Sequence, residues 1–273
     1  MNRKVTYKSE IRESILDYLA GDDRTIVNYL ASNSNLPGPR GNLEMAEAFA
    51  DLAGEMSIKE PIKIWKLAAD MAAIPPEAAP VNDPMEMVPF CGTVAIGAIA
   101  SAQEGLDEKA FALLRKMADD PRWRTREAVA MGLQRMIAKD GRAVMTELES
   151  WIKSGEWLRM RAAMAGVAEP ALLKDPELAR RALDLHKGAI AEVQRSGNRK
   201  DEGFRTLRQA LGYSLSVVVS ECPGEGFRYI DRIAHTSDPD IRWIVKENLK
   251  KKRLTKSYPR EVAEVTDILN GRP

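Results

Sequence analysis

Arginine and tryptophan side chains recur together at several places in this sequence of 273 residues. Proteins use an arginine beside an aromatic ring to hold a single strand or a flipped base, because the ring stacks while the cation neutralises phosphate. The same pairing also anchors one helix to another. The candidate binding residues of this kind are Arg122, Trp123, Arg124, Trp157, Arg159, Arg205, Arg208, Trp243, Lys246 and Lys250.

The elements that position these side chains are predicted to be helices. Ala, Leu, Glu, Lys, Arg and Met dominate the sequence, and runs of β-branched residues are few, which favours an all-α fold. Apolar residues make up 44% of the chain and charged residues 30%, as in a folded globular protein. Four prolines between Ile74 and Pro84 predict an extended connector rather than a helix.

The stretch from Asp119 to Gln134 has the pattern of a turn followed by the second helix of a helical hairpin, and a second copy runs from Asp238 to Leu249. Arginines on the predicted second helices are spaced by 35 residues from Arg126 to Arg161 and by 81 residues from Arg161 to Arg242. The second interval corresponds to two units of about 40 residues, so both intervals are typical of two-helix solenoid repeats.

The sequence Asp-Pro-x-x-x-x-Arg-x-Ala-x-Ala-x-x-Leu at 120–133, with Asp-Pro-Asp-Ile-Arg at 238–242, resembles the HEAT-repeat family over roughly residues 105–253. The resemblance implies a right-handed α-solenoid of two-helix repeats, whose second helices line a concave face that binds proteins or nucleic acid. It also implies that turn aspartates pair with second-helix arginines of neighbouring repeats. The residues of this predicted ladder are Asp120, Arg126, Arg161, Asp238 and Arg242.

We therefore predict a single α-solenoid domain over residues 1–273. A divergent helical part occupies residues 1–84, HEAT-like repeats occupy 85–253, and a capping helix occupies 254–273. The apolar stretch from Met87 to Ala102 is predicted to be a buried helix of the stack, with Gly92 and Gly97 allowing close approach of its neighbours. It is too short and too rich in Gly and Ala for a membrane span.

A second resemblance concerns the segment from Trp151 to Arg161, which is similar over about one hairpin to the alkylpurine DNA glycosylases built from HEAT-like repeats. That resemblance implies a carboxylate placed among aromatic rings, where it would stabilise a positively charged sugar. Glu156 is the nearest acid, and it is predicted to lie in a turn. A lyase or assembly factor acting on a chromophore protein is a third option, because some of those proteins share this repeat.

Other kinds of site have little support in the sequence. Cys91 and Cys222 are the only cysteines and His186 and His235 the only histidines, so we expect no disulfide framework, no metal site and no cofactor. Nothing suggests a signal peptide or a membrane span, and we expect a cytoplasmic location.

The charge of the chain is unevenly distributed. Residues 1–90 carry nine Lys/Arg against fourteen Asp/Glu, whereas residues 91–273 carry thirty-two against twenty-six. The run from Lys246 to Lys256 is the sharpest basic cluster, and such a run is either a solvated helix end or a site for phosphates or an acidic partner.

These observations favour a non-enzymatic scaffold that binds a macromolecule, most simply a protein, through the concave face of the solenoid. The alternative is a DNA-binding protein of the alkylation-repair type, with or without glycosylase activity. The electrostatic character of the second-helix surface discriminates between them, since a continuous positive groove suits nucleic acid and a mixed groove suits protein.

Overall fold

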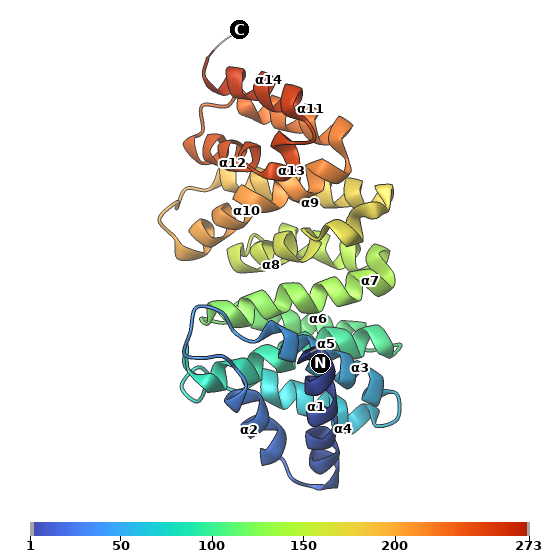
Figure 1. The fold of residues 1–273 in the computed structure, drawn as a ribbon. Coiled ribbons are helices and arrows are strands. Elements are labelled where there is room, and N and C mark those ends of the chain that lie inside the picture. Colours follow the sequence, from blue (N-terminus) through green and yellow to red (C-terminus); the bar gives the residue numbers. More distant parts are fainter. Residues whose placement is uncertain (1–2, 272–273) are drawn as a thin grey trace. The chain divides into compact units, whose positions relative to one another are not determined.

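The computed structural model describes residues 3–271, and all regular structure in this range is helical. These residues form two compact units, one that ends at Lys139 and one that begins at Asp140. The predicted all-α class is confirmed, and in each unit successive helices stack as hairpins in the manner of an α-solenoid (Figure 1).

The first unit contains six α-helices, one short 3-10 helix and the first part of a seventh α-helix. They are α1 (Arg3–Ala20), α2 (Arg24–Ser32), α3 (Leu43–Ser57), α4 (Pro61–Ala72), η1 (Pro84–Glu86), α5 (Met87–Ala102), α6 (Asp107–Ala118) and α7 (Trp123–Lys153). Within α7 only Asp140 has a non-helical backbone, with φ −140° and ψ 81°. The boundary between the two units coincides with this interruption.

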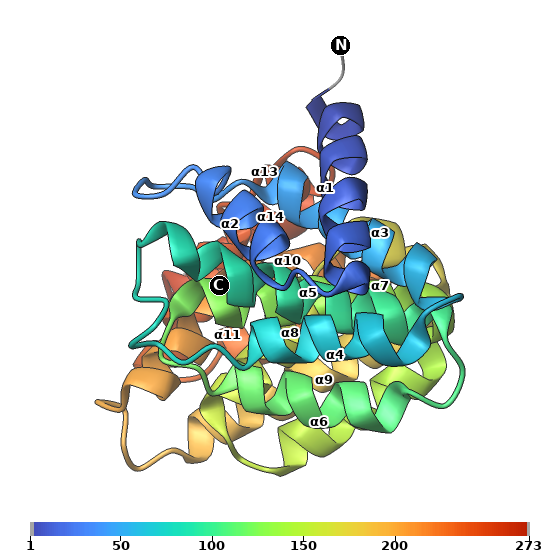
Figure 2. The same ribbon diagram turned by 90° about the horizontal axis from the view of Figure 1, so that it is seen from below.

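Helix α5 is the core of the first unit. Every residue from Met87 to Ala100 is buried, and the helix contacts α2, α3, α4 and α6 (Figure 2). This confirms the prediction of a buried helix. Within residues 3–271, Pro84–Ala102 is the one helical stretch with the length and apolar composition of a membrane span, and 83% of its apolar 18-residue window is buried inside the protein.

Two glycines let α5 and α7 approach closely. A Cβ atom on Gly97 would lie 2.2 Å from the carbonyl oxygen of Gly132, well inside van der Waals contact. Only a hydrogen atom fits at Gly97, so the backbones of the two helices can come together there. The face of α7 that carries Gly132 is thereby fixed against α5.

The second unit consists of the rest of α7 and the helices that follow it. They are α8 (Trp157–Val167), η2 (Pro170–Lys174), α9 (Pro176–Arg195), α10 (Glu202–Glu221), α11 (Pro223–Ala234), α12 (Pro239–Leu249), α13 (Lys252–Thr255) and α14 (Pro259–Leu269). Helix α10 packs against α8 on one side and α12 on the other, while α9 and α11 are the first helices of the hairpins that α10 and α12 complete. Packing between neighbouring repeats is the defining feature of a solenoid.

Asp-Pro pairs start two helices in this unit, and the sequence pattern at Asp238 predicts one of them. The side chain of Asp175 accepts a hydrogen bond from the backbone N–H of Glu177, and Asp238 accepts from those of Asp240 and Ile241. In both cases the following proline occupies the first helical turn, where its missing N–H leaves no partner unsatisfied. These aspartates are therefore N-caps.

Candidate binding surface

Arg208 on α10 and Trp243 on α12 are both half-buried, and their side chains contact each other. The guanidinium carbon of Arg208 lies 3.9 Å from the centroid of the Trp243 ring, in cation–π geometry. The ring also lies against Gly212, where a Cβ atom would come within 2.8 Å of it. Arginine and tryptophan from α10 and α12 therefore meet, as their pairing in the sequence suggests, but they form an inter-helix contact.

Carboxylates neutralise much of the positive charge at this point. Nε of Arg208 lies 2.7 Å from Oδ1 of Asp240, and Arg199 binds both Asp238 and Asp240 at 2.6 Å. Arg199 holds the pKa of the Asp238 carboxyl below its usual range. The result is a network of alternating charge that joins the loop before α10 to the start of α12.

The exposed residues around this pair follow helical spacing. Arg205 and Tyr213 are exposed on α10, and Lys246 and Lys250 are exposed at and just beyond the end of α12. Lys250 pairs with Glu247 at 2.5 Å. We call Arg205, Arg208, Tyr213, Trp243 and Lys246 the α10–α12 face.

Trp157 and Arg159 lie at the start of α8, beside α10. The Trp157 ring meets Phe204 edge to face, with 5.5 Å between the ring centroids, and its Cβ abuts Gly203. Both Trp157 and Arg159 are half-buried. Trp157 thus packs between two second helices, which is a structural role for an aromatic ring.

The prediction that Arg122 and Arg124 lie on a binding surface is wrong. Their exposed fractions are 1% and 4%. Arg122 donates to both carboxylate oxygens of Asp120, at 2.9 and 2.7 Å, and to the carbonyl oxygens of Ile74 and Ala79. Burial of a guanidinium requires such complete pairing, because an unpaired buried charge is strongly disfavoured.

Arg124 is buried through contacts with two distant segments. It binds Glu86 at 2.8 Å and the carbonyl oxygen of Gly38 at 2.8 Å, and Glu86 is itself fully buried. Of this predicted trio only Trp123 is exposed, at 45%, and Arg124 lies 4.4 Å from its ring centroid. The arginines of this segment therefore bind the loops of the first unit together.

The predicted aspartate–arginine ladder is also wrong in its pairing. Asp120 binds Arg122, whereas Arg126 donates to the carbonyl oxygens of Asp120 and Pro121 at 2.7 and 3.0 Å. The reason is local, because Arg122 is close enough in sequence to fold back onto Asp120.

In the second unit the pairing differs from the ladder in the same way. Asp238 binds Arg199, and Arg242 donates to the carbonyl oxygens of Ala234, Thr236 and Leu269. Arg161, the remaining member of the predicted ladder, is a buried residue of α8. Arg126 and Arg242 thus bind carbonyl groups at helix ends and in loops.

A groove in the first unit was not anticipated from the sequence. It has a volume of about 480 Å³ and is lined by residues of α3, α5 and α7: Ala50, Asp51, Gly54, Glu55, Ala98, Ser101, Ala102, Arg135 and Ala138. Small residues at intervals of four on α3 (Ala50, Gly54) and α5 (Ala98, Ala102) are the sequence signal that would have revealed it.

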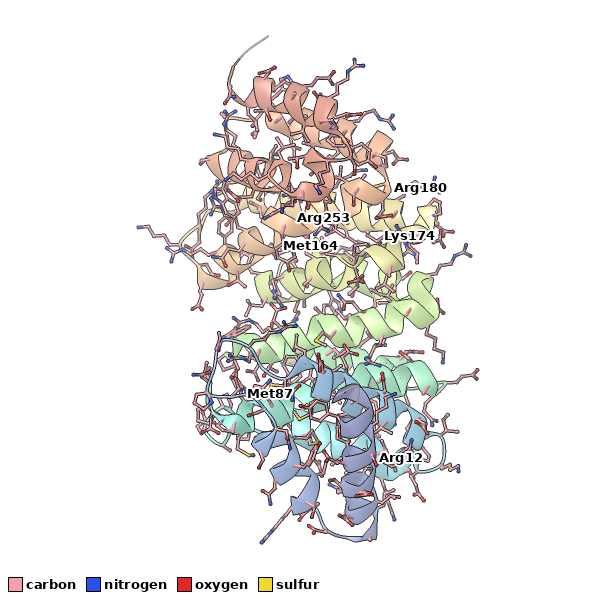
Figure 3. The ribbon with its side chains drawn as sticks, in the orientation of Figure 1. Arg12, Met87, Met164, Lys174, Arg180 and Arg253 are labelled. Carbon is pink, nitrogen blue, oxygen red and sulfur yellow. The ribbon has the colours of Figure 1, made fainter. Side chains whose placement is uncertain are left out.

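The walls of this groove carry paired charges. Arg135 binds Asp51 at 2.9 Å and also Glu47, and Arg12, labelled in Figure 3, donates to Glu55 at 2.8 Å. Acids and bases thus alternate along a floor of Ala and Gly. Such a surface offers both donors and acceptors to the backbone of a bound segment.

Burial shifts the pKa values of both cysteine thiols and of the His186 imidazole. Burial raises the pKa of the Cys91 thiol, and it raises that of Cys222 to about 11, so neither thiol is activated. Burial lowers the pKa of His186 to about 4. Among residues 3–271 no group of three or more His, Cys, Asp and Glu side chains could hold a metal ion.

Comparisons with known proteins add little to these observations. No family model matches the chain, and no curated protein matches it. Among solved structures, it is similar to "Designed armadillo repeat protein YIII(Dq)4CqI", at 13% sequence identity and a TM-score of 0.29, with 82% of this chain and 98% of that chain covered.

Proposed function

We propose that this protein is a non-enzymatic scaffold that binds a protein partner through the exposed surfaces of its second helices. The observation that carries the proposal is the mixed charge of these surfaces. In the first unit, Arg135 lies between Glu47 and Asp51, and in the second unit Asp240 lies between Arg199 and Arg208. Alternating charges complement a polypeptide better than they complement a row of phosphates.

The groove of the first unit is the best candidate for holding an extended segment of that partner. Its floor of Ala50, Gly54 and Ala98 lets a backbone approach closely. Its walls offer the carboxylates of Asp51 and Glu55 and the guanidinium of Arg135 for hydrogen bonds to peptide groups. A nucleic-acid backbone would instead meet the two carboxylates with like charge.

Filling the groove tests the proposal. Ala138 is exposed and lines the groove, so Ala138→Trp would block it without disturbing the core. Ala112→Trp is the matched control, because Ala112 is exposed on α6 and does not line the groove. Purified wild-type and control proteins should each retain a stoichiometric partner from nuclease-treated native lysate, and Ala138→Trp should lose it.

Loss of all bound material on nuclease treatment would reject the protein-binding function. Equal retention of the partner by the Ala138→Trp variant would reject the groove as its binding site. Identification of the retained chain by mass spectrometry, followed by reconstitution with that chain alone, excludes indirect capture.

One observation favours the DNA-binding alternative. The carboxylate of Asp240 lies beside Arg208, which covers the Trp243 ring, so an acid, a base and an aromatic ring do come together on α10 and α12. Against it, Arg199 and Arg208 both engage Asp240, and Trp243 packs on Gly212. Incubation with alkylated duplex is decisive: base release that Asp240→Asn abolishes would establish the alternative, and no release would dismiss glycosylase activity.

A further inference from the structure

The basic run near the C-terminus of the second unit does not continue a single helix. Helix α12 ends at Leu249, and Lys251 has an extended backbone with φ −73° and ψ 130° before α13 begins at Lys252. On one continuous helix, four successive side chains would point in four directions. The change of backbone direction at Lys251 instead places the side chains of residues 250–253 around one cavity.

This cavity, which we call the basic pocket, has a volume of about 690 Å³. It is lined by Pro170, Ser220, Glu221, Lys250, Lys251, Lys252, Arg253, Ser257 and Tyr258. Arg253 is labelled in Figure 3. The volume lies within the range of about 300–1,000 Å³ that is usual for small-molecule sites.

The segment that carries the four cations is held firmly to the rest of the unit. Leu254 is fully buried, and the hydroxyl of Tyr258 donates to the carbonyl oxygen of Ser220 at 3.2 Å. The Tyr258 ring also packs against Phe227, with 5.4 Å between the ring centroids. The pocket is therefore a feature of the fold rather than of a loose basic tail.

Few of these charges are compensated. Glu221 is the only carboxylate in the lining, and it pairs with Lys174 at 2.9 Å. Lys250 pairs with Glu247. Within residues 3–271, Lys251, Lys252 and Arg253 have no carboxylate partner. Charges of one sign around a concavity concentrate the local field and attract a counter-ion of opposite sign.

We propose that the basic pocket binds a small ligand that carries two or more phosphate groups. Phosphate oxygens only accept hydrogen bonds, and the pocket supplies donors from Lys251, Lys252 and Arg253 together with the Ser257 hydroxyl. The guanidinium of Arg253 can bind one phosphate in bidentate fashion while the ammonium groups bind another. Since the cations converge on one cavity rather than forming a track, they suit a compact anion.

Isothermal titration of the full chain with sodium tripolyphosphate tests this site. We expect saturable binding to one site per chain that weakens as salt rises. The double variant Lys252→Glu/Arg253→Glu should weaken it by at least about a hundredfold, because each lost charged hydrogen bond is worth about tenfold or more. Both residues are exposed, so the fold should tolerate the change.

Arg180→Glu/Lys153→Glu is the matched control, since it makes the same change in net charge at exposed positions outside the pocket (Figure 3 labels Arg180). This variant should bind tripolyphosphate within about threefold of wild type, allowing for long-range charge effects. Absence of saturable binding, or equal loss in the two double variants, would overturn the proposal.

Fructose 1,6-bisphosphate and inorganic phosphate distinguish the source of the phosphates. Competition by the bisphosphate indicates a phosphate ester, whereas binding of tripolyphosphate alone indicates an inorganic polyphosphate, and both support the site. Inorganic phosphate should bind at least about tenfold more weakly than tripolyphosphate, because it fills only part of the donor set. Equal affinity for the two would contradict the requirement for several phosphates.

Discussion

The guanidinium of Arg208 covers one part of the Trp243 ring, while the ring itself rests on helix α10 at Gly212, a position where a methyl group would not fit. Two second helices are thus joined by an arginine, a tryptophan and a glycine. This relationship explains how side chains suited to nucleic-acid binding can serve packing between repeats instead.

A methyl group at Gly212 should displace the Trp243 ring. In a helix Gly→Ala normally stabilises by about 1 kcal/mol, but here the new Cβ would lie 2.8 Å from the ring. Gly212→Ala should therefore lower the free energy of unfolding by about 1–3 kcal/mol. Urea denaturation measures it. Gly224→Ala in α11, which meets nothing within 4 Å, serves as the control and should be neutral or stabilising; equal behaviour of the two variants would refute the packing role.

The buried pair of Arg124 and Glu86 should be essential to the first unit. Glu86→Gln leaves the Arg124 charge buried and unpaired, so it should cost about 3–5 kcal/mol of unfolding free energy. Replacing both, as Glu86→Gln with Arg124→Met, should recover part of that loss. The exposed pair of Lys66 and Asp70 is the comparison, and Asp70→Asn should change stability by less than about 0.5 kcal/mol. A Glu86→Gln effect as small as that of Asp70→Asn would contradict the buried-pair account.

At the close crossing of α5 and α7, an added methyl group should be more destabilising at Gly97 on α5 than at Gly132 on α7. A Cβ on Gly97 meets the Gly132 backbone at 2.2 Å, whereas a Cβ on Gly132 meets its nearest atoms at 3.2 and 3.3 Å. Gly97→Ala should destabilise by about 3 kcal/mol or more, and Gly132→Ala by about 1 kcal/mol. Thermal unfolding of both variants gives the comparison, and similar melting temperatures would show that the helices adjust freely.

The neutral imidazole of His186 should make stability depend on pH. Its Nδ1 lies 2.8 Å from the carbonyl oxygen of Ala182, which only accepts, so Nδ1 carries the proton and Nε2 accepts from the Ser214 hydroxyl. Burial lowers its pKa from 6.5 to about 4 in the folded state. Between these values the unfolded chain binds a proton that the folded chain does not.

The contribution of His186 to the unfolding free energy is therefore fully present above pH 6.5. It decreases as pH falls towards 4, and the total loss is about 3 kcal/mol. Carboxyl groups in model peptides titrate at about pH 4, so the useful quantity is the difference in unfolding free energy between variants at each pH. His186→Gln should flatten the dependence of stability on pH, while His235→Gln, at the exposed residue that follows α11, should leave it as in wild type. Denaturant midpoints measured from pH 4 to 8 decide between these outcomes.

Local signals in the sequence were sufficient for most of the fold. Asp175 and Asp238 each precede a proline, and capping of the next turn needs only residues two or three positions away. The burial of α5 follows from its own composition, since a helix that is apolar on all sides must be covered. These features depend on neighbours in the sequence, so they could be predicted from it.

The candidate site depended on distant partners, and its prediction was less successful. Arg124 is buried by its contacts with Glu86 and Gly38, which lie 38 and 86 residues earlier in the chain. No residue near Arg124 in the sequence indicates either contact. Trp123 beside it is exposed, whereas Arg124 is not. A pattern of arginines and aromatics therefore cannot by itself separate a buried ion pair from a binding residue.

The burial of α5 on every side also has a consequence for biosynthesis. Helices α2, α3 and α4 precede α5 in the chain and all contact it, so its first cover is already available as it leaves the ribosome. Without α5, the apolar faces of α3 and α4 would remain in water. A ribosome stalled before Met87 would thus carry an aggregation-prone nascent chain, which chaperones would bind or proteases would degrade.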